Sequence, residues 1–383
     1  QDYWGRTPLL VPADPGEGFA DLFSLDAADE LLSRRGLRTP FLRVFKDGSA
    51  IDPSQYTRTG GAGAEVADQA AADKVLGLVV DGSTVVLQGL HRVWSPLIDF
   101  ADQLAAEIGH PVQVNAYITP PQSQGFAIHY DVHDVFVLQI AGRKRWQVRE
   151  PTVPLPLRSQ PWKSGAATVA RAESQPPVID TVLSPGDALY LPRGYLHSAQ
   201  ALGEVCAHLT VGVHAVTRYA LVEALCALAA DEPALRESLP LGIDVADPGA
   251  LAVELEETIR VLVKRVEAAD SSDVARRVRS RVWSGSRAAP IAPLAQAAAI
   301  GTLDGHSVVV LRPRLRHHLR HDGDRLVLEM PDRTMTLPES TGASLEVILA
   351  GEPVRVDDLP ALDSADRLVL VRRLLREAVV VPA

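Results

Sequence analysis

The sequence predicts an α+β protein in which an antiparallel β-barrel is followed by a helical segment and a small mixed module. Up to about residue 214, short alternating apolar and polar runs are broken by Pro and Gly, which is typical of antiparallel strands. Between about 216 and 281, apolar residues recur at helical spacing, as at Leu251, Leu255, Ile259, Leu262 and Val266. We therefore divide the chain into domains at residues 1–215, 216–298 and 299–383.

Five segments of the first domain carry the strand pattern, namely 112–119, 134–141, 144–149, 187–191 and 205–214. In the last of them, one parity is apolar throughout, whereas the other contains His208, Thr210 and His214. The first segment is similar, because Gln113, Asn115, Tyr117 and Thr119 share one face. Two such strands predict a barrel with a cavity lined by polar side chains.

The last domain follows a stretch rich in Gly, Ala and Pro. Strands are expected at 308–313 and 325–330, and helices near 343–349 and 363–377, which suits a small winged-helix-like module. The apolar stripes of the preceding helices need a partner surface, either the barrel or a second copy of the chain.

Composition limits the class of function. A formal charge of -10 argues against a protein that mainly binds nucleic-acid phosphates. The most basic stretch, 312–321, is interpreted as a solvated face or, alternatively, a docking patch. The sequence lacks a long uncharged apolar run and a secretory pattern, which predicts a cytoplasmic protein without membrane contact. Cys206 and Cys226 are too few for a disulfide framework.

A candidate metal site begins with His129 and Asp131. Because these residues are two apart, both side chains leave the same face of an extended chain and can share one ion. A triad of two histidines and one carboxylate, which leaves positions open on Fe(II), also needs a distant second histidine. His197 fits, because it follows an apolar strand and a Pro/Gly bend. His133 has the same parity as Asp131 and is a competing ligand in this interpretation.

These motifs resemble those of the JmjC-type cupin protein hydroxylases called ribosomal oxygenases. The matching residues are Pro8-Leu9-Leu10, 114–120, Ser123-Gln124-Gly125, His129-Tyr130-Asp131, 134–139, Trp146, 151–155, Pro185-Gly186-Asp187 and Pro192-Arg193-Gly194. The order of domains matches as well. The resemblance implies a double-stranded β-helix (cupin/JmjC) barrel, a helical dimerisation domain that forms a homodimer, and a C-terminal winged-helix-like domain.

The resemblance also assigns roles to the residues of the barrel. It implies that His129, Asp131 and His197 are the catalytic ligands of Fe(II), and that 2-oxoglutarate is the co-substrate. Lys144 would bind the distal carboxylate of 2-oxoglutarate, for which a lysine ammonium is suited. The residues alone favour a solvated basic turn for Arg143-Lys144-Arg145.

Three further positions match supporting hydrogen-bond donors of the family, namely Asn115, Tyr117 and Thr210. Arg143 and Arg145 have the opposite strand parity from Lys144 and should point away from the pocket. His208 and His214 are expected to be structural.

The activity implied is that of a dioxygenase that uses O2 to hydroxylate His or Arg of a ribosomal protein or another polypeptide. Two alternatives keep this chemistry on a peptide natural product or on methyl-lysine. A third is a non-catalytic metal-binding cupin whose tail contacts nucleic acid. The triad, Lys144 and the acidic net charge argue against that third possibility.

Overall fold

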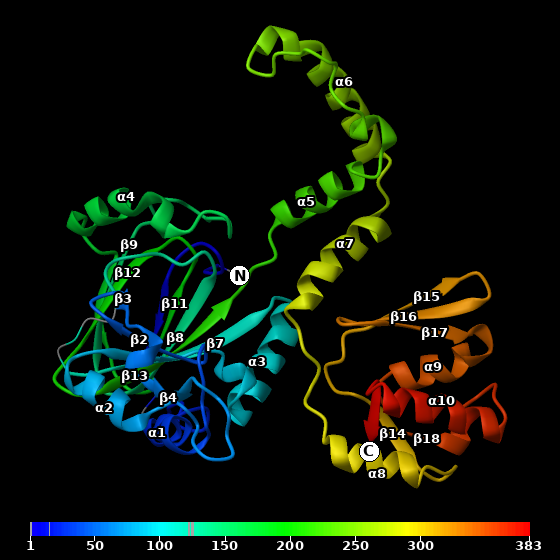
Figure 1. The fold of residues 1–383 in the computed structure, drawn as a ribbon, viewed down its shortest axis with the longest axis horizontal. Coiled ribbons are helices and arrows are strands. Elements are labelled where there is room, and N and C mark those ends of the chain that lie inside the picture. The colour runs from blue at the N-terminus through cyan, green and yellow to red at the C-terminus, as the bar shows by residue number, and fades with distance from the viewer. Residues whose placement is uncertain (1, 15, 122, 124–125) are drawn as a thin grey trace. The chain divides into compact units, whose positions relative to one another are not determined.

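The chain folds as two compact units, Gln1–Ala215 and Val216–Ala383. The computed structural model describes residues 2–14, 16–121, 123 and 126–383, with only the backbone of Ser284 (Figure 1). Gln124 and Gly125 of the matched Ser123-Gln124-Gly125 motif lie outside the described residues. No helix in the described part of the chain has the length and apolar character needed to cross a membrane.

Two sheets build the barrel of the first unit, and a separate two-stranded sheet is formed by β4 (Thr57–Arg58) and β5 (Gln69–Ala70). The large sheet has eight strands in the order β1-β11-β8-β13-β7-β6-β2-β3, and the small sheet has the order β10-β9-β12. The bounds are β1 (Leu9–Val11), β2 (Leu42–Lys46), β3 (Ser49–Ala50), β6 (Thr84–Leu87), β7 (Val112–Thr119), β8 (Asp134–Ala141), β9 (Lys144–Arg149), β10 (Ile179–Leu183), β11 (Ala188–Leu191), β12 (Leu196–Ala201) and β13 (Cys206–Val213). All five predicted strand segments are strands, which confirms the α+β barrel.

Three helices cover the outer face of the large sheet. Helix α1 (Leu25–Arg34) begins at Ser24, whose hydroxyl accepts a hydrogen bond from Ala27 N–H. Helices α2 (Ala72–Val80) and α3 (Ser95–Ile108) follow. Leu31 of α1 and Leu97 of α3 share one apolar core with Val114 of β7. Because this face of the sheet is taken by helices, the polar face of β7 and β13 lies toward the inside of the barrel.

The turn between β8 and β9 depends on Gly142, whose φ is +62°. A Cβ atom there would lie 2.5 Å from the carbonyl oxygen of Val205. Gly142→Ala is therefore expected to lower the free energy of unfolding by about 3 kcal/mol, since a left-handed residue costs about 1–2 kcal/mol before the clash is added.

Gly36 supplies the matched control for this prediction. Its φ is +60°, and nothing lies within 4 Å of an added Cβ. Gly36→Ala should cost only the backbone part, about 1 kcal/mol. Denaturant unfolding of both variants measures the difference, and equal losses would contradict the role given to the Val205 contact.

The second unit contains the helices expected from the apolar spacing, α5 (Arg218–Ala229), α6 (Pro248–Glu267) and α7 (Ser271–Ser284). The remaining elements are α8 (Pro293–Gly301), β14 (Val308–Leu311), β15 (His318–Asp322), β16 (Arg325–Glu329), β17 (Thr334–Pro338), α9 (Gly342–Leu349), β18 (Val354–Arg355), α10 (Ser364–Arg376) and β19 (Val380–Pro382). Their core includes Leu326, Leu345 and Leu374.

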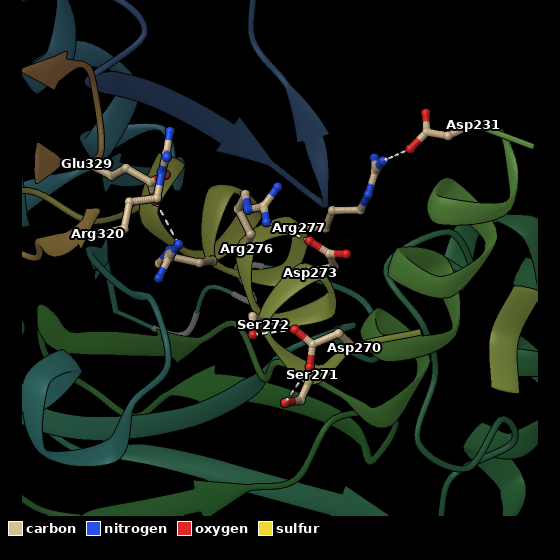
Figure 2. A network of polar contacts seen from close by, with 10 residues as sticks. Asp231, Asp270, Ser271, Ser272, Asp273, Arg276, Arg277, Arg320 and Glu329 are labelled. Atoms are coloured by element: carbon tan, nitrogen blue, oxygen red, sulfur yellow. Dashed lines mark hydrogen bonds and ion pairs between the residues drawn. The ribbon is translucent and has the colours of Figure 1, made fainter. Parts of the chain in front are cut away.

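A polar network joins α7 to the β15–β16 hairpin. The carboxylate of Glu329 lies 2.7 Å from the Arg279 guanidinium and 3.1 Å from that of Arg320. Figure 2 shows Arg320 and Glu329 together with the contact of Arg277 with Asp231. Part of the basic stretch 312–321 is thus bound within the fold instead of facing only solvent.

Candidate metal centre

The structure brings His129, Asp131 and His197 together at one end of the barrel. One ligand atom from each lies within 4.8 Å of the others, and His197 Nε2 is 3.6 Å from Asp131 Oδ2. His129 and Asp131 lie between β7 and β8, whereas His197 lies on β12. An antiparallel backbone bridge joins the two histidines, with His197 N–H donating to His129 O at 2.8 Å. The backbone alone therefore places the two imidazoles side by side.

Both imidazoles are oriented by backbone carbonyl groups. His129 Nδ1 lies 2.8 Å from Ala127 O, and His197 Nδ1 lies 3.1 Å from Tyr195 O. With a proton on each Nδ1, both Nε2 lone pairs are available to a metal. Burial, followed by the neighbouring His129, lowers the pKa of His197 to about 4, so His197 is neutral at pH 7. Two imidazoles and one carboxylate are a donor set that fits Fe(II).

Hydrogen bonds and an ion pair connect the bend before β12 with the residues at and just before the start of β8. Gly194 N–H donates to Asp131 O at 3.0 Å. The neighbouring Arg193 guanidinium lies 3.3 Å from the fully buried carboxylate of Asp134, which also accepts a hydrogen bond from Tyr190 at 2.8 Å. These contacts hold the segment that carries His197 against the segment that carries Asp131.

The metal candidates line a cavity of about 490 Å³ between the two sheets. Its inner wall includes Tyr117, Thr119, Lys144, Trp146, His208 and Thr210. Further lining residues are Arg43, Phe45, Asp47, Phe126, Trp162 and Lys163. The polar-lined cavity predicted from the parity of β7 and β13 is thus present.

Lys144 is a buried cation on the wall of this cavity, with 3% of its surface exposed. Its Nζ donates to Thr119 Oγ1 at 3.2 Å and lies 3.4 Å from His208 Nδ1. No carboxylate among the described residues forms an ion pair with it, and burial lowers the pKa of Lys144 to about 8. A buried ammonium without a counter-ion is unfavourable until an anion arrives, so this part of the cavity suits a carboxylate.

The two neighbouring arginines face outward, as the strand parity predicts. Arg143 and Arg145 are exposed, and Arg145 pairs with Asp180 at 2.7 Å. The alternative interpretation of residues 143–145 as a solvated turn thus applies to both arginines but not to Lys144.

The other predicted binding residues divide into two groups. Tyr117 and Thr210 line the cavity. Asn115 is not among the described residues that line it, and its Oδ1 accepts a hydrogen bond from Gly89 N–H at 2.9 Å. The assignment of all three to co-substrate binding stays a prediction.

Two histidines differ in where the fold places them. His133 stacks on His214, with ring centroids 5.0 Å apart, and does not belong to the group of three described above. His208, expected to be structural, lines the cavity beside Lys144. The sequence signal for this position was that His208 shares a strand face with Thr210. Strand parity alone, however, does not distinguish a histidine packed in the core from one that lines a cavity.

Comparison with known proteins gives matches of three kinds. The JmjC domain profile matches residues 93–221. The chain is 31% identical over 264 residues to the bifunctional lysine-specific demethylase and histidyl-hydroxylase NO66 of Drosophila persimilis, covering 63% of this chain and 34% of that protein. It is 30% identical over 282 residues to human ribosomal oxygenase 1, covering 69% of this chain and 42% of that protein. The chain thus spans less than half the length of these relatives.

The fold also matches the crystal structure of the Escherichia coli ribosomal oxygenase YcfD. The TM-score is 0.55 at 18% identity, with 100% of this chain and 96% of that chain covered. A second structure of YcfD, in complex with cobalt and 2-oxoglutarate, matches with a TM-score of 0.53 at 18% identity and covers 99% of this chain and 95% of that chain.

The two barrel sheets, together with His129, Asp131 and His197, form a JmjC-type cupin with a candidate metal centre. A JmjC domain is thus matched at residues 93–221, and the similarity to NO66 and ribosomal oxygenase 1 supports the ribosomal oxygenase family that the motifs indicated.

Proposed function

We propose that the chain is an Fe(II)- and 2-oxoglutarate-dependent dioxygenase that hydroxylates a His or Arg side chain of a ribosomal protein. The observation that carries this proposal is one cavity that contains both the three candidate metal ligands and the buried ammonium of Lys144, for which the described residues supply no carboxylate partner. Three protein ligands leave positions for co-substrate and O2. The names of NO66 and ribosomal oxygenase 1, and the YcfD complex with cobalt and 2-oxoglutarate, support the assignment.

The residues of the chain bind, orient and shield the reactants. His129, Asp131 and His197 would hold the iron, and Lys144 would bind the distal carboxylate of 2-oxoglutarate. Fe(II) and 2-oxoglutarate together supply the oxidation of an unactivated C–H bond by O2. Val135, Val137 and Trp146 give the cavity an apolar wall that limits access of water.

Charges among the cavity-lining residues favour histidine over arginine as the target. The Arg43 guanidinium lies 4.7 Å from the centre of the Phe45 ring, and the exposed ammonium of Lys163 also lines the cavity. Besides the metal candidate Asp131, Asp47 is the acidic residue among the described lining residues. A flat, neutral imidazole can lie against Phe45, Phe126 or Trp162 without the repulsion that a guanidinium would meet.

Mass spectrometry of ribosomal proteins tests the proposal. Unmodified ribosomal proteins and a methyl-lysine peptide are incubated with the protein, Fe(II), 2-oxoglutarate and O2, with His129→Ala as the control. The expected result is one added oxygen atom on a histidine, absent from the control. Formation of succinate without any modified ribosomal protein would refute the proposed substrate class. Absence of 2-oxoglutarate turnover would refute the proposed oxygenase activity.

Affinity for 2-oxoglutarate is expected to fall above about pH 8. Lys144 must be protonated to pair with a carboxylate, and burial lowers its pKa from 10.5 to about 8. Lys144 is therefore almost fully protonated at about pH 7 and half protonated at about pH 8, and the affinity declines by up to about ten-fold per pH unit above that. Titrations of 2-oxoglutarate across this range measure the effect. Lys144→Arg stays charged and should lack the decline; an equal decline in this variant would assign it to another group.

We further propose that residues 216–298 form a dimerisation domain and that residues 299–383 form a winged-helix-like domain. Helix α6 supports the first assignment, because none of its residues is buried. Leu255, Ile259 and Val263, spaced by four, share one face and are 56%, 50% and 48% exposed. A second copy of the chain would cover this face. Light scattering should give twice the chain mass of 41.2 kDa. A mass equal to that of one chain at micromolar concentration would contradict the dimer.

A further inference from the structure

We propose that His208 is a positioning residue of the co-substrate site, because its Nδ1 accepts a hydrogen bond from Lys144 and fixes the ammonium on the cavity wall. The inference rests on the proposed function, since it assigns the ammonium to the distal carboxylate of 2-oxoglutarate. It concerns a residue that the sequence motifs do not connect with co-substrate binding.

Aromatic neighbours on two strands fix the ring of His208. The residue lies on β13 and is paired with Tyr117 on β7. Its ring stacks on that of Tyr117 with centroids 5.1 Å apart and planes 6° from parallel. The Trp146 ring on β9 meets it nearly edge-on, at 5.3 Å and 86°. With 4% of the residue exposed, the imidazole has little freedom to rotate, so the direction of Nδ1 is set by packing.

The ammonium of Lys144 has three N–H donors on a flexible four-carbon stem. Thr119 Oγ1 at 3.2 Å and His208 Nδ1 at 3.4 Å are acceptors for two of them. The third donor is left for an incoming carboxylate. Two fixed acceptors thus convert a flexible cation into an oriented one, which lowers the entropy lost when the co-substrate binds.

The chemistry of the imidazole suits this task. Burial, followed by the charges of Lys144 and His197, lowers the pKa of His208 well below its ordinary value, so the ring is neutral and can accept. A carboxylate at this place would neutralise Lys144 and compete with the co-substrate. A neutral acceptor orients the ammonium and leaves its charge available.

Two substitutions of His208 test the proposal, one that keeps the aromatic ring without the acceptor atom and one that keeps an acceptor atom without the ring. His208→Phe keeps an aromatic ring between Tyr117 and Trp146 but removes the acceptor. His208→Asn loses the ring but can place Oδ1 near the position of Nδ1. His214→Phe is the matched control, because His214 is a histidine of the same strand parity that stacks on His133. Each protein is loaded with Fe(II) without oxygen, and 2-oxoglutarate is titrated by its charge-transfer absorption.

We expect His208→Phe to bind 2-oxoglutarate about ten-fold more weakly at unchanged Fe(II) affinity, since one hydrogen bond to a charged group is lost. His208→Asn should recover part of the loss, and His214→Phe should match the natural chain. Equal binding by the natural chain and His208→Phe would overturn this inference alone. Absence of 2-oxoglutarate binding by the natural chain would overturn the proposed function and this inference with it.

A measurement on the natural chain covers the case in which His208→Phe does not fold. Nitrogen-15 NMR of labelled histidine reports which ring nitrogen carries the proton. The expected signal for His208 is a protonated Nε2 and a bare, hydrogen-bonded Nδ1. A proton on Nδ1 would overturn the inference, because that nitrogen could then not accept from Lys144.

Discussion

His129→Ala is expected to lower the affinity for Fe(II) by at least about 100-fold, since changing a residue that only supports a metal ligand already costs about 10- to 100-fold. The variant keeps Asp131 and His197, whose side chains lie 3.6 Å apart, but it loses one of the three donors. Turnover of 2-oxoglutarate should disappear with the metal. Titration with Fe(II) under anaerobic conditions measures the binding, and succinate formation measures the turnover.

His133→Ala is the control for this experiment. His133 lies two residues from Asp131 and was a competing ligand on sequence grounds, but its ring packs on His214. The variant should therefore keep its metal. A loss of Fe(II) affinity as large as that of His129→Ala would favour His133 as a ligand and refute the assignment made here.

Lys144→Met is expected to weaken 2-oxoglutarate binding by about 100-fold or more, because breaking a buried charge pair typically costs about 3–5 kcal/mol. Methionine keeps much of the length of the side chain but removes the charge and both contacts, with Thr119 and His208. Fe(II) affinity should remain unchanged, since Lys144 does not belong to the metal group. Anaerobic titration of the iron-loaded protein with 2-oxoglutarate gives the dissociation constant.

Arg145→Met supplies the comparison, because it removes a cation from the next position of the same strand. Arg145 is exposed and pairs with Asp180, outside the cavity. Its replacement should leave 2-oxoglutarate binding within experimental error of the natural chain. Similar losses in both variants would show that the general charge of residues 143–145, and not the buried ammonium, attracts the co-substrate.

Five of the barrel strands, β7, β8, β9, β11 and β13, could be predicted from the residue pattern. In β7 and β13, apolar residues such as Val114 and Leu209 alternate with polar ones, and the structure places the apolar set in the helix-covered core. Strand β12 was not predicted. Its sequence, LHSAQA, lacks β-branched residues, and it is a strand because it pairs with β9 along its whole length.

In the candidate site, local relations between residues could be predicted from the sequence, whereas the depth of a side chain within the barrel could not. The spacing of two places His129 and Asp131 on one side of the chain, and this local relation needs no tertiary information. Lys144 differs, since the residues alone favoured a solvated turn and only the resemblance favoured a binding role. Asn115 and Tyr117 share a face of β7, but the pattern does not reveal that only Tyr117 reaches the cavity lining. Depth within a barrel depends on strands that are distant in sequence.

The backbone bridge between His129 and His197 has a consequence for metal selectivity. Because main-chain hydrogen bonds already hold the imidazoles together, a divalent ion enters a preformed site and does not have to organise the polypeptide. Because folding of such a site is not coupled to metal binding, folding does not discriminate between metals. Nitrogen and oxygen donors bind cobalt, nickel and copper at least as strongly as iron. Under the proposed function, occupancy by iron would then depend on which metals the surroundings of the protein offer, and the supply of iron would become part of what controls turnover.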